Sequence, residues 1–307
     1  KFNMSEFFLE LFSEEIPPKL QINARKKLFL EISNFFQESN IEIKGPKASF
    51  STPNRIIINF SNISKEVTKK STEIRGPSVN AKSEALEGFL KSLNITKLQI
   101  NSKTTDKGEF YFYKKPEQKF KTQDLLKENL PLILDKINWN KSMKWGNNRM
   151  FWGRPLKSIL AIFNQKKIEF NFHHLKSSNN TFIDKDFEDK KKNFNNFKSY
   201  QRYFKSIKII LDQDKRKEFI INELNKISKK NNLTIELKEN LLEDINNIVE
   251  KPKIILCKFD KKFLKIPKEI LIITMQNHQK YIPTFDKKQN LTNFFLVVSD
   301  SKDIKGY

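Results

Sequence analysis

The spacing of apolar residues along the chain predicts several helices. After Pro17-Pro18, apolar side chains recur every three or four positions, which predicts a helix over 18–37. Proline fits the first turn of a helix because the amide hydrogen that it lacks would have no partner there. The same spacing predicts helices over 82–93, 122–137, 214–229 and 238–249, and Pro131 is expected to kink or split the second of these four.

Other segments show the short apolar runs and the alternation that are typical of β-strands. They lie at 6–11, 55–60, 109–114, 159–163, 167–172, 208–211, 253–259, 281–285 and 294–298. Asn164-Gln165-Lys166 predicts a hairpin between two of them, and Asp106-Lys107-Gly108 predicts another hairpin turn. Because helices and strands alternate without a regular period, we expect an α+β fold with mixed or antiparallel sheets and packed helices.

The length of 307 residues predicts two subdomains. We expect an N-terminal α+β domain over 1–145 and a second α+β domain over 146–307, in which the Lys/Asn-rich stretch 176–198 forms a mobile loop or a linker. No apolar run is long enough to cross a membrane, and the first residues do not show the pattern of a signal peptide. A cytoplasmic protein without a membrane partner is therefore expected.

The chain is strongly cationic. It has 58 Lys and Arg residues against 36 Asp and Glu residues, a net charge of +22 and a pI of about 9.7. Lys, Asn, Ile and Phe are all abundant, as an AT-rich genome would make them, so compositional bias explains part of the excess. The remaining excess still attracts polyanions. The seven arginines are more informative than the lysines, because a guanidinium group pairs with phosphate through two hydrogen bonds.

Few residues are available for a nucleotide-binding loop or a metal centre. The seven glycines are too scattered for either G-x-G-x-x-G or G-x-x-x-x-G-K-[ST]. Cys257 is the single cysteine and is predicted to be a buried strand residue, and the histidines are His173, His174 and His278. We therefore predict no catalytic, cofactor-binding or metal site within this chain.

Short sequence blocks follow one another in the order typical of one protein family. The first are Phe8-Leu9-Glu10-Leu11, Glu14-Glu15-Ile16-Pro17-Pro18-Lys19, Thr52-Pro53-Asn54-Arg55-Ile56, Arg75-Gly76-Pro77, Glu87-Gly88-Phe89 and Thr104-Thr105-Asp106-Lys107-Gly108-Glu109. The later ones are Met143-Lys144-Trp145-Gly146, Arg154-Pro155, Leu241-Leu242-Glu243, Val249-Glu250-Lys251-Pro252, Phe263-Leu264-Lys265-Ile266-Pro267-Lys268-Glu269 and Thr274-Met275-Gln276-Asn277-His278-Gln279-Lys280-Tyr281. Together they resemble the N-terminal portion of the β subunit of bacterial heterotetrameric glycyl-tRNA synthetase.

This resemblance implies a division of labour between two subunits. In that family the α subunit carries the class II aminoacylation site, which binds glycine and ATP together with Mg. The β subunit makes most of the contacts with tRNA. The usual form is a cytoplasmic α2β2 assembly. The resemblance thus implies that an α subunit and glycine tRNA are partners and that DNA is not. It also implies HD-like and anticodon-binding domains that are absent from this chain. The chain departs from the family at a Gly-His-Arg-Phe block, which is replaced by Thr-Phe-Ile-Asp-Lys-Asp-Phe at 181–187.

We expect the contacts with tRNA to come from a small set of residues. Arg149 and Arg154 stand beside Trp145, Phe151 and Trp152, so that cations and stacking surface occur in one short segment. The two tryptophans fit a role in the core equally well. The other predicted contacts are Lys144, Arg75, His278 and Lys280. For the Arg75-Gly76-Pro77 block, a turn and an anion-binding nest both fit the sequence.

Three functions are compatible with these patterns. The best supported is a non-catalytic tRNA-binding and assembly part of a glycine–tRNA ligase, with the ATP chemistry on the partner α subunit. A stand-alone RNA-binding module would fail to bind any α subunit. A hydrolytic editing domain would use a histidine such as His278, since imidazole titrates near neutral pH.

Overall fold

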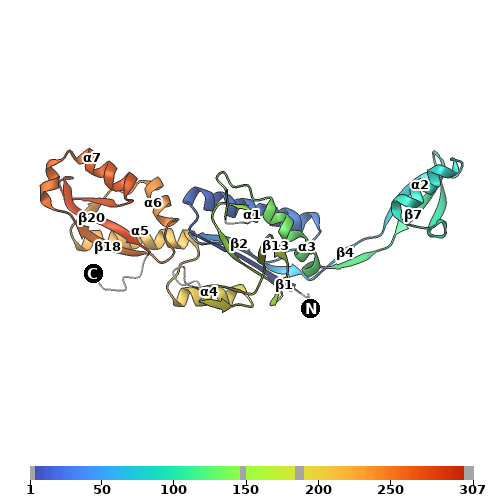
Figure 1. Ribbon diagram of the computed structural model, residues 1–307, viewed down its shortest axis with the longest axis horizontal. Coiled ribbons are helices and arrows are strands. Elements are labelled where there is room, and N and C mark those ends of the chain that lie inside the picture. Colours follow the sequence, from blue (N-terminus) through green and yellow to red (C-terminus); the bar gives the residue numbers. More distant parts are fainter. Residues whose placement is uncertain (1–3, 146–149, 184–189, 301–307) are drawn as a thin grey trace. The chain divides into compact units, whose positions relative to one another are not determined.

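The computed structural model describes residues 4–145, 150–183 and 190–300 (Figure 1). The chain divides into two compact units, of which unit 1 contains 1–64 and 126–307, and unit 2 contains 65–125. The predicted domain boundary at 145/146 does not coincide with this division. The reason is that β1 (Met4–Ser13) pairs with β11 (Leu156–Phe163), so strands from both sides of the predicted boundary share one sheet.

A five-stranded antiparallel sheet forms the centre of unit 1. Its strand order is β12-β11-β1-β3-β2, and β2 (Lys47–Thr52), β3 (Arg55–Ser64) and β12 (Lys166–Lys167) complete it. The hairpin predicted at Asn164-Gln165-Lys166 is confirmed, although its second strand is only two residues long. Asn164 and Gln165 both have positive φ angles, as a tight hairpin turn requires.

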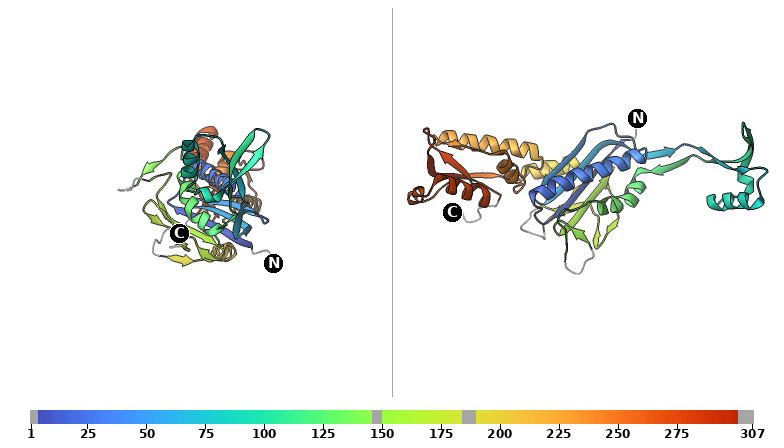
Figure 2. Two further views of the ribbon diagram at one scale, coloured as in Figure 1. Left: turned by 90° about the vertical axis from the view of Figure 1, so that its right-hand side faces the viewer. Right: turned by 90° about the horizontal axis from the view of Figure 1, so that it is seen from above.

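Helices cover both faces of this sheet because neighbouring residues of a strand point to opposite sides. On one face the ring of Phe7 lies 5.8 Å from that of Phe36 in α1 (Pro18–Glu38), which runs along the sheet (Figure 2). On the other face the ring of Phe8 lies 4.8 Å from that of Tyr200 in α4 (Phe197–Ser206). The predicted helix over 18–37 and the predicted strands at 6–11 and 55–60 are thereby confirmed.

A second, four-stranded antiparallel sheet belongs to the same unit. Its order is β17-β19-β20-β18, with β17 (Thr234–Ile235), β18 (Lys253–Lys258), β19 (Ile282–Phe285) and β20 (Leu291–Ser299). Buried Leu224 of α5 (Gln213–Lys230) and Leu242 of α6 (Glu239–Asn246) share a core cluster with Ile282 and Leu296. The segments η2 (Lys261–Lys265), α7 (Lys268–Ile273) and η3 (Thr274–His278) connect β18 to β19.

Unit 2 consists of two small antiparallel sheets and a helix. β4 (Glu66–Lys69) pairs with β8 (Gln118–Lys121), while β5 (Thr72–Ser78), β6 (Ile100–Thr105) and β7 (Gly108–Lys115) form a three-stranded sheet in the order β5-β7-β6. α2 (Ser83–Leu93) and η1 (Lys97–Gln99) lie between β5 and β6 in sequence. The hairpin turn predicted at Asp106-Lys107-Gly108 is confirmed, and Gly108 has a φ of 110°, which suits glycine.

The remaining elements belong to unit 1, apart from the start of α3, which unit 2 contains up to Leu125. They are α3 (Thr122–Asp135), β9 (Met143–Lys144), β10 (Phe151–Trp152), β13 (Asn171–Phe172), β14 (Leu175–Lys176), β15 (Asn180–Phe182) and β16 (Lys191–Asn193). Helix α3 continues through Pro131, so the proline does not split it. The stretch 176–198, predicted as a loop or linker, contains the β15–β16 pair and the start of α4.

Several local predictions were wrong. The predicted strand 208–211 is instead a turn at Lys208, where φ is 67°, followed by an irregular connection. In it Ile209 and Leu211 pack into the core, and the amide of Ile210 bonds to the carbonyl of Glu250. Cys257 lies in β18 as predicted, but its side chain is only half-buried. The block Arg75-Gly76-Pro77 is not a turn, since it lies within β5 at a shift of register.

Candidate nucleic-acid interface

Three of the residues predicted to contact tRNA lie on or next to a two-stranded hairpin. They are Lys144, Trp145 and Arg154. β9 and β10 pair antiparallel, with Lys144 opposite Phe151. The Nζ atom of Lys144 lies 5.0 Å from the centroid of the Phe151 ring, and 59% of Phe151 is exposed. An ammonium group and an aromatic ring therefore lie side by side on the surface, as in sites that bind single-stranded nucleic acid. Arg149 lies outside the described residues.

The two tryptophans of this segment have different roles. Trp152 is only 2% exposed and is therefore a core residue. Trp145 is half-buried, and its Nε1 donates a hydrogen bond of 3.3 Å to the carbonyl of Trp152. The large exposed aromatic surface of the hairpin thus belongs to Phe151 rather than to either tryptophan.

Arg154 lies at a surface hollow of about 490 Å³ that contains both signs of charge. Its Nη1 donates to the carbonyl of Gly153 at 3.1 Å. Across the hollow, Lys157 forms an ion pair of 3.4 Å with Glu14. An anion bound to Arg154 would meet the carboxylates of Glu14 and Glu15, which both line the hollow, so the hollow is a weaker phosphate site than its cations alone suggest.

The other three predicted contacts lie on other elements. Arg75 is exposed on β5 of unit 2, with its guanidinium carbon 3.5 Å from the centroid of the Phe110 ring. His278 is exposed at the end of η3, four residues before β19 begins at Ile282. Lys280 Nζ lies 2.8 Å from Asp244 Oδ2, which balances its charge.

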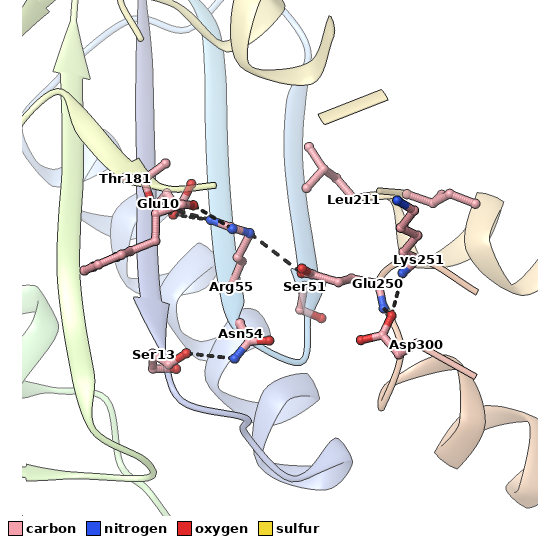
Figure 3. Close-up of polar contacts among 12 residues, drawn as sticks. Glu10, Ser13, Ser51, Asn54, Arg55, Thr181, Leu211, Glu250, Lys251 and Asp300 are labelled. Carbon is pink, nitrogen blue, oxygen red and sulfur yellow. Dashed lines mark hydrogen bonds and ion pairs between the residues drawn. The ribbon is translucent and has the colours of Figure 1, made fainter. Parts of the chain in front are cut away.

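The main polar cluster of unit 1 was missed by the sequence prediction. Arg55 is fully buried, and its Nη1 donates to Glu10 Oε1 at 2.9 Å (Figure 3). Its Nη2 donates to the carbonyl of Phe182 at 2.7 Å, and its Nε lies 3.7 Å from Glu250 Oε2. Burial alone lowers the pKa of Arg55, but the nearby carboxylates of Glu10 and Glu250 raise it above its ordinary value, so the guanidinium stays charged.

This cluster joins sequence blocks that carry the family resemblance. Glu10 belongs to the first block, Arg55 to the third and Glu250 to the block ending at Pro252. The amides of Glu250 and Lys251 both donate to Asp300 Oδ1 at 2.7 Å, which ties the second sheet to the same place. These blocks therefore have a structural role. An arginine followed by three isoleucines is the signal in the sequence that could have revealed it.

The described residues offer no metal site, since among them no group of three His, Cys, Asp or Glu side chains is placed to hold a metal ion. In the described segments, none of the helices has the length and the apolar character needed to cross a membrane.

Comparison with known proteins gives the relationship of the chain. It is 36% identical over 299 residues to the glycine–tRNA ligase beta subunit of Rickettsia canadensis (strain McKiel), which covers 97% of this chain and 44% of that protein. The beta subunits of Rickettsia felis and Rickettsia bellii (strain OSU 85-389) are 35% identical over 301 residues and 36% identical over 299 residues, each covering 97% of this chain and 45% of the relative. The chain thus spans less than half the length of these curated relatives. The family described as Glycyl-tRNA synthetase beta subunit matches residues 7–306, and the chain belongs to that family.

Proposed function

We propose that this chain is a non-catalytic tRNA-binding and assembly part of a glycine–tRNA ligase. The ATP chemistry, with Mg, takes place on a partner α subunit in a cytoplasmic α2β2 assembly. The observation that carries the binding role is the exposed pair of Lys144 and Phe151 on the β9–β10 hairpin. The relatives named above are glycine–tRNA ligase beta subunits, which supports glycine tRNA as the RNA in this proposal.

The hairpin suits RNA because it offers two kinds of contact. Lysine ammonium groups neutralise phosphates and release counterions, which makes the affinity depend on salt. An exposed aromatic ring stacks on an unpaired base whatever its sequence. The net charge of +22 adds long-range attraction for a polyanion. Lys144 with Phe151 provides both contacts, and Arg154 stands two residues after β10.

The assembly role is supported by an apolar surface on η2 and α7. Large hydrophobic side chains that are 38% to 55% exposed gather between β18 and β19: Phe263, Leu264, Ile266, Ile270 and Ile273. Grouped exposure of this kind marks contact surfaces between proteins more often than free surface. We therefore assign this surface to contacts with the α subunit or with the remainder of the β subunit.

The other two functions have less support. Within the described part of the chain, His278 is exposed and has no carboxylate partner that would orient it as a general base, so the editing hypothesis has no geometric basis. A stand-alone RNA-binding module would use the same hairpin but would not need the apolar surface.

The test is to mix the chain with an α subunit of glycine–tRNA ligase and glycine tRNA at several salt concentrations. Complex size would be followed by light scattering and charging by glycine incorporation into tRNA. A stable complex with altered charging supports the proposal. Binding to tRNA alone favours the RNA-binding module, and absence of any association contradicts both. Hydrolysis of mischarged tRNA by the chain would instead support the editing hypothesis.

A further inference from the structure

A small aromatic cavity lies beside the β9–β10 hairpin. Its volume is about 270 Å³, close to the lower end of the range for small-molecule sites. The cavity is therefore large enough for one planar ring system but not for a length of nucleic acid. The lining residues that matter for its chemistry are Asp135, Trp139, Phe151, Trp152, Phe172 and His173.

The aromatic rings of this cavity are held firmly in place. The centroids of the Trp139 and Trp152 rings are 5.0 Å apart, and those of Trp152 and Phe172 are 5.7 Å apart. Gly153 packs against the Trp139 ring so closely that an added Cβ atom would lie 2.3 Å from Cε3. Since Trp152 and Phe172 are buried, the rigid walls come from the core, and exposed Phe151 supplies the open side.

Polar groups at the cavity complement the edge of a heterocycle. Trp139 Nε1 is buried and, among the residues that the structure describes, has no hydrogen-bond partner. The indole N–H has almost no accessible surface, so a ligand in the cavity does not reach it. Asp135 Oδ1 lies 3.2 Å from His173 Nε2, and both residues line the cavity. This polar pair and the aromatic rings thus line the same small space.

Charge identifies the class of ligand. Lys141 and Lys144 are exposed next to the cavity in sequence, and Lys144 lies over the Phe151 ring. Aromatic side chains together with cations that reach the adjoining phosphates are how proteins hold unpaired bases. We propose that this cavity binds one unpaired nucleobase of a bound RNA, stacked on the exposed ring of Phe151 with its polar edge toward Asp135 and His173. This inference rests on the proposed RNA-binding function and adds the base-binding site to it.

The test compares two single-stranded probes with the same phosphates. Both are ribose-phosphate oligomers of about twelve units, within the usual site size of ~4–16 nucleotides. One carries a single 2-aminopurine base and the other is abasic throughout. We expect the base-bearing oligomer to bind about tenfold more tightly, as base stacking commonly provides. Its 2-aminopurine fluorescence should be quenched on binding.

Variants of the cavity keep the test specific. Phe151→Ala and Gly153→Ala should remove the difference between the two oligomers, the first by removing a ring and the second by displacing Trp139. Leu132→Ala is the matched control, since Leu132 is also 59% exposed but does not line the cavity.

The possible outcomes separate the inference from the function on which it rests. Equal, salt-dependent binding of both oligomers would overturn the base-binding site but leave the proposed function intact. Failure of the chain to bind either oligomer or glycine tRNA would overturn both. Loss of α-subunit binding by Phe151→Ala, with unchanged affinity for both oligomers, would assign this surface to a protein partner and would also overturn the inference.

Discussion

Arg55 donates a hydrogen bond of 2.9 Å to Glu10, and both side chains are fully buried in the five-stranded sheet. The guanidinium carbon lies 4.6 Å from the ring centroid of Phe12 and 4.5 Å from that of Phe204, so aromatic rings exclude water from the pair. Burial of two charges is tolerated because each has its partner. Loss of one partner leaves the other charge buried without compensation.

Replacement of Arg55 by methionine should therefore strongly destabilise unit 1. Glu10 and Glu250 would remain buried without their cation, and we expect the free energy of unfolding to fall by about 3–5 kcal/mol. Urea denaturation followed by circular dichroism measures this change. A loss below about 1 kcal/mol would contradict the role assigned to the pair. Lys27→Met is the control, because Lys27 forms a 2.7 Å ion pair with Glu31 at the partly exposed surface of α1, and surface pairs contribute about 0–1 kcal/mol.

Arg216 should not tolerate replacement by lysine. Its guanidinium group donates to four carbonyls, those of Asn246 at 3.0 Å, Ile210 at 2.6 Å, Leu211 at 3.4 Å and Ser51 at 2.9 Å. Burial lowers the pKa of Arg216 to about 10. Lysine lacks the planar fork, so carbonyls would lose their donors and we expect unfolding to become easier by about 2–4 kcal/mol.

The control for Arg216→Lys is Arg202→Lys, which makes the same substitution at an exposed residue of α4. It should alter the free energy of unfolding by less than about 0.5 kcal/mol. Similar losses for both variants would show that the four carbonyl contacts of Arg216 add nothing to stability.

Glu6 predicts a measurable dependence of stability on pH. Burial raises the pKa of its carboxyl group above 4.5, although the amide of Phe197, which donates to Glu6 Oε2 at 2.8 Å, opposes this shift. Between the unfolded and the folded pKa, the folded state binds more protons. This contribution to stability therefore increases as the pH falls through the folded pKa and levels off below the unfolded pKa.

Comparison with Glu6→Gln isolates this contribution, because glutamine does not titrate. The difference in unfolding free energy, wild type minus variant, should rise as the pH is lowered from 7 to about 4.5. Urea denaturation of both proteins at several pH values measures it. Curves that stay parallel over this range would show that Glu6 has the same pKa in both states.

Two glycines should respond in opposite ways to alanine. At Gly45 an added Cβ atom would lie 2.6 Å from the carbonyl oxygen of Ser61, so the backbone must move and we expect a loss of about 1–3 kcal/mol. At Gly88, inside α2, a Cβ atom would meet nothing within 4 Å, and alanine should stabilise the helix by about 0.5–1 kcal/mol. Hydrogen exchange of the amides in each unit measures both effects. Protection that changes in the same direction in both variants would contradict the expectation.

The sequence predicted the positions of helices and strands better than it predicted which polar residues are buried and which segments pair as strands. The helical repeat after Pro18 located α1, and the apolar run at 6–11 located β1, because local spacing reports which face is buried. It could not show that Arg55 is buried, since a charged residue in a strand is usually taken to face water. The apolar run 208–211 likewise reported burial correctly but not the lack of a strand partner.

The same limit applies to the candidate interface. Its position near Lys144, Trp145 and Arg154 was predictable, because cations and aromatic residues are adjacent in the sequence. The cavity beside it was not, since Trp139 and Phe172 meet Trp152 only through folding. The exposure of Phe151 and the burial of Trp152, its neighbour, depend on the pleat of β10 and on which face the core covers.

The cations on and next to the hairpin should contribute to the salt dependence of tRNA binding. Each lysine or arginine that neutralises a phosphate adds about 0.9 to the slope of log affinity against log salt concentration. The double variant Lys144→Ala with Arg154→Ala should therefore bind glycine tRNA more weakly and reduce this slope by up to about 2. Filter binding over a series of salt concentrations measures both. Lys230→Ala, at the exposed end of α5, removes a cation away from the hairpin and should leave the slope unchanged. If the double variant and the control behave alike, the hairpin cations do not contact phosphate, and the affinity arises from the net charge of the whole chain.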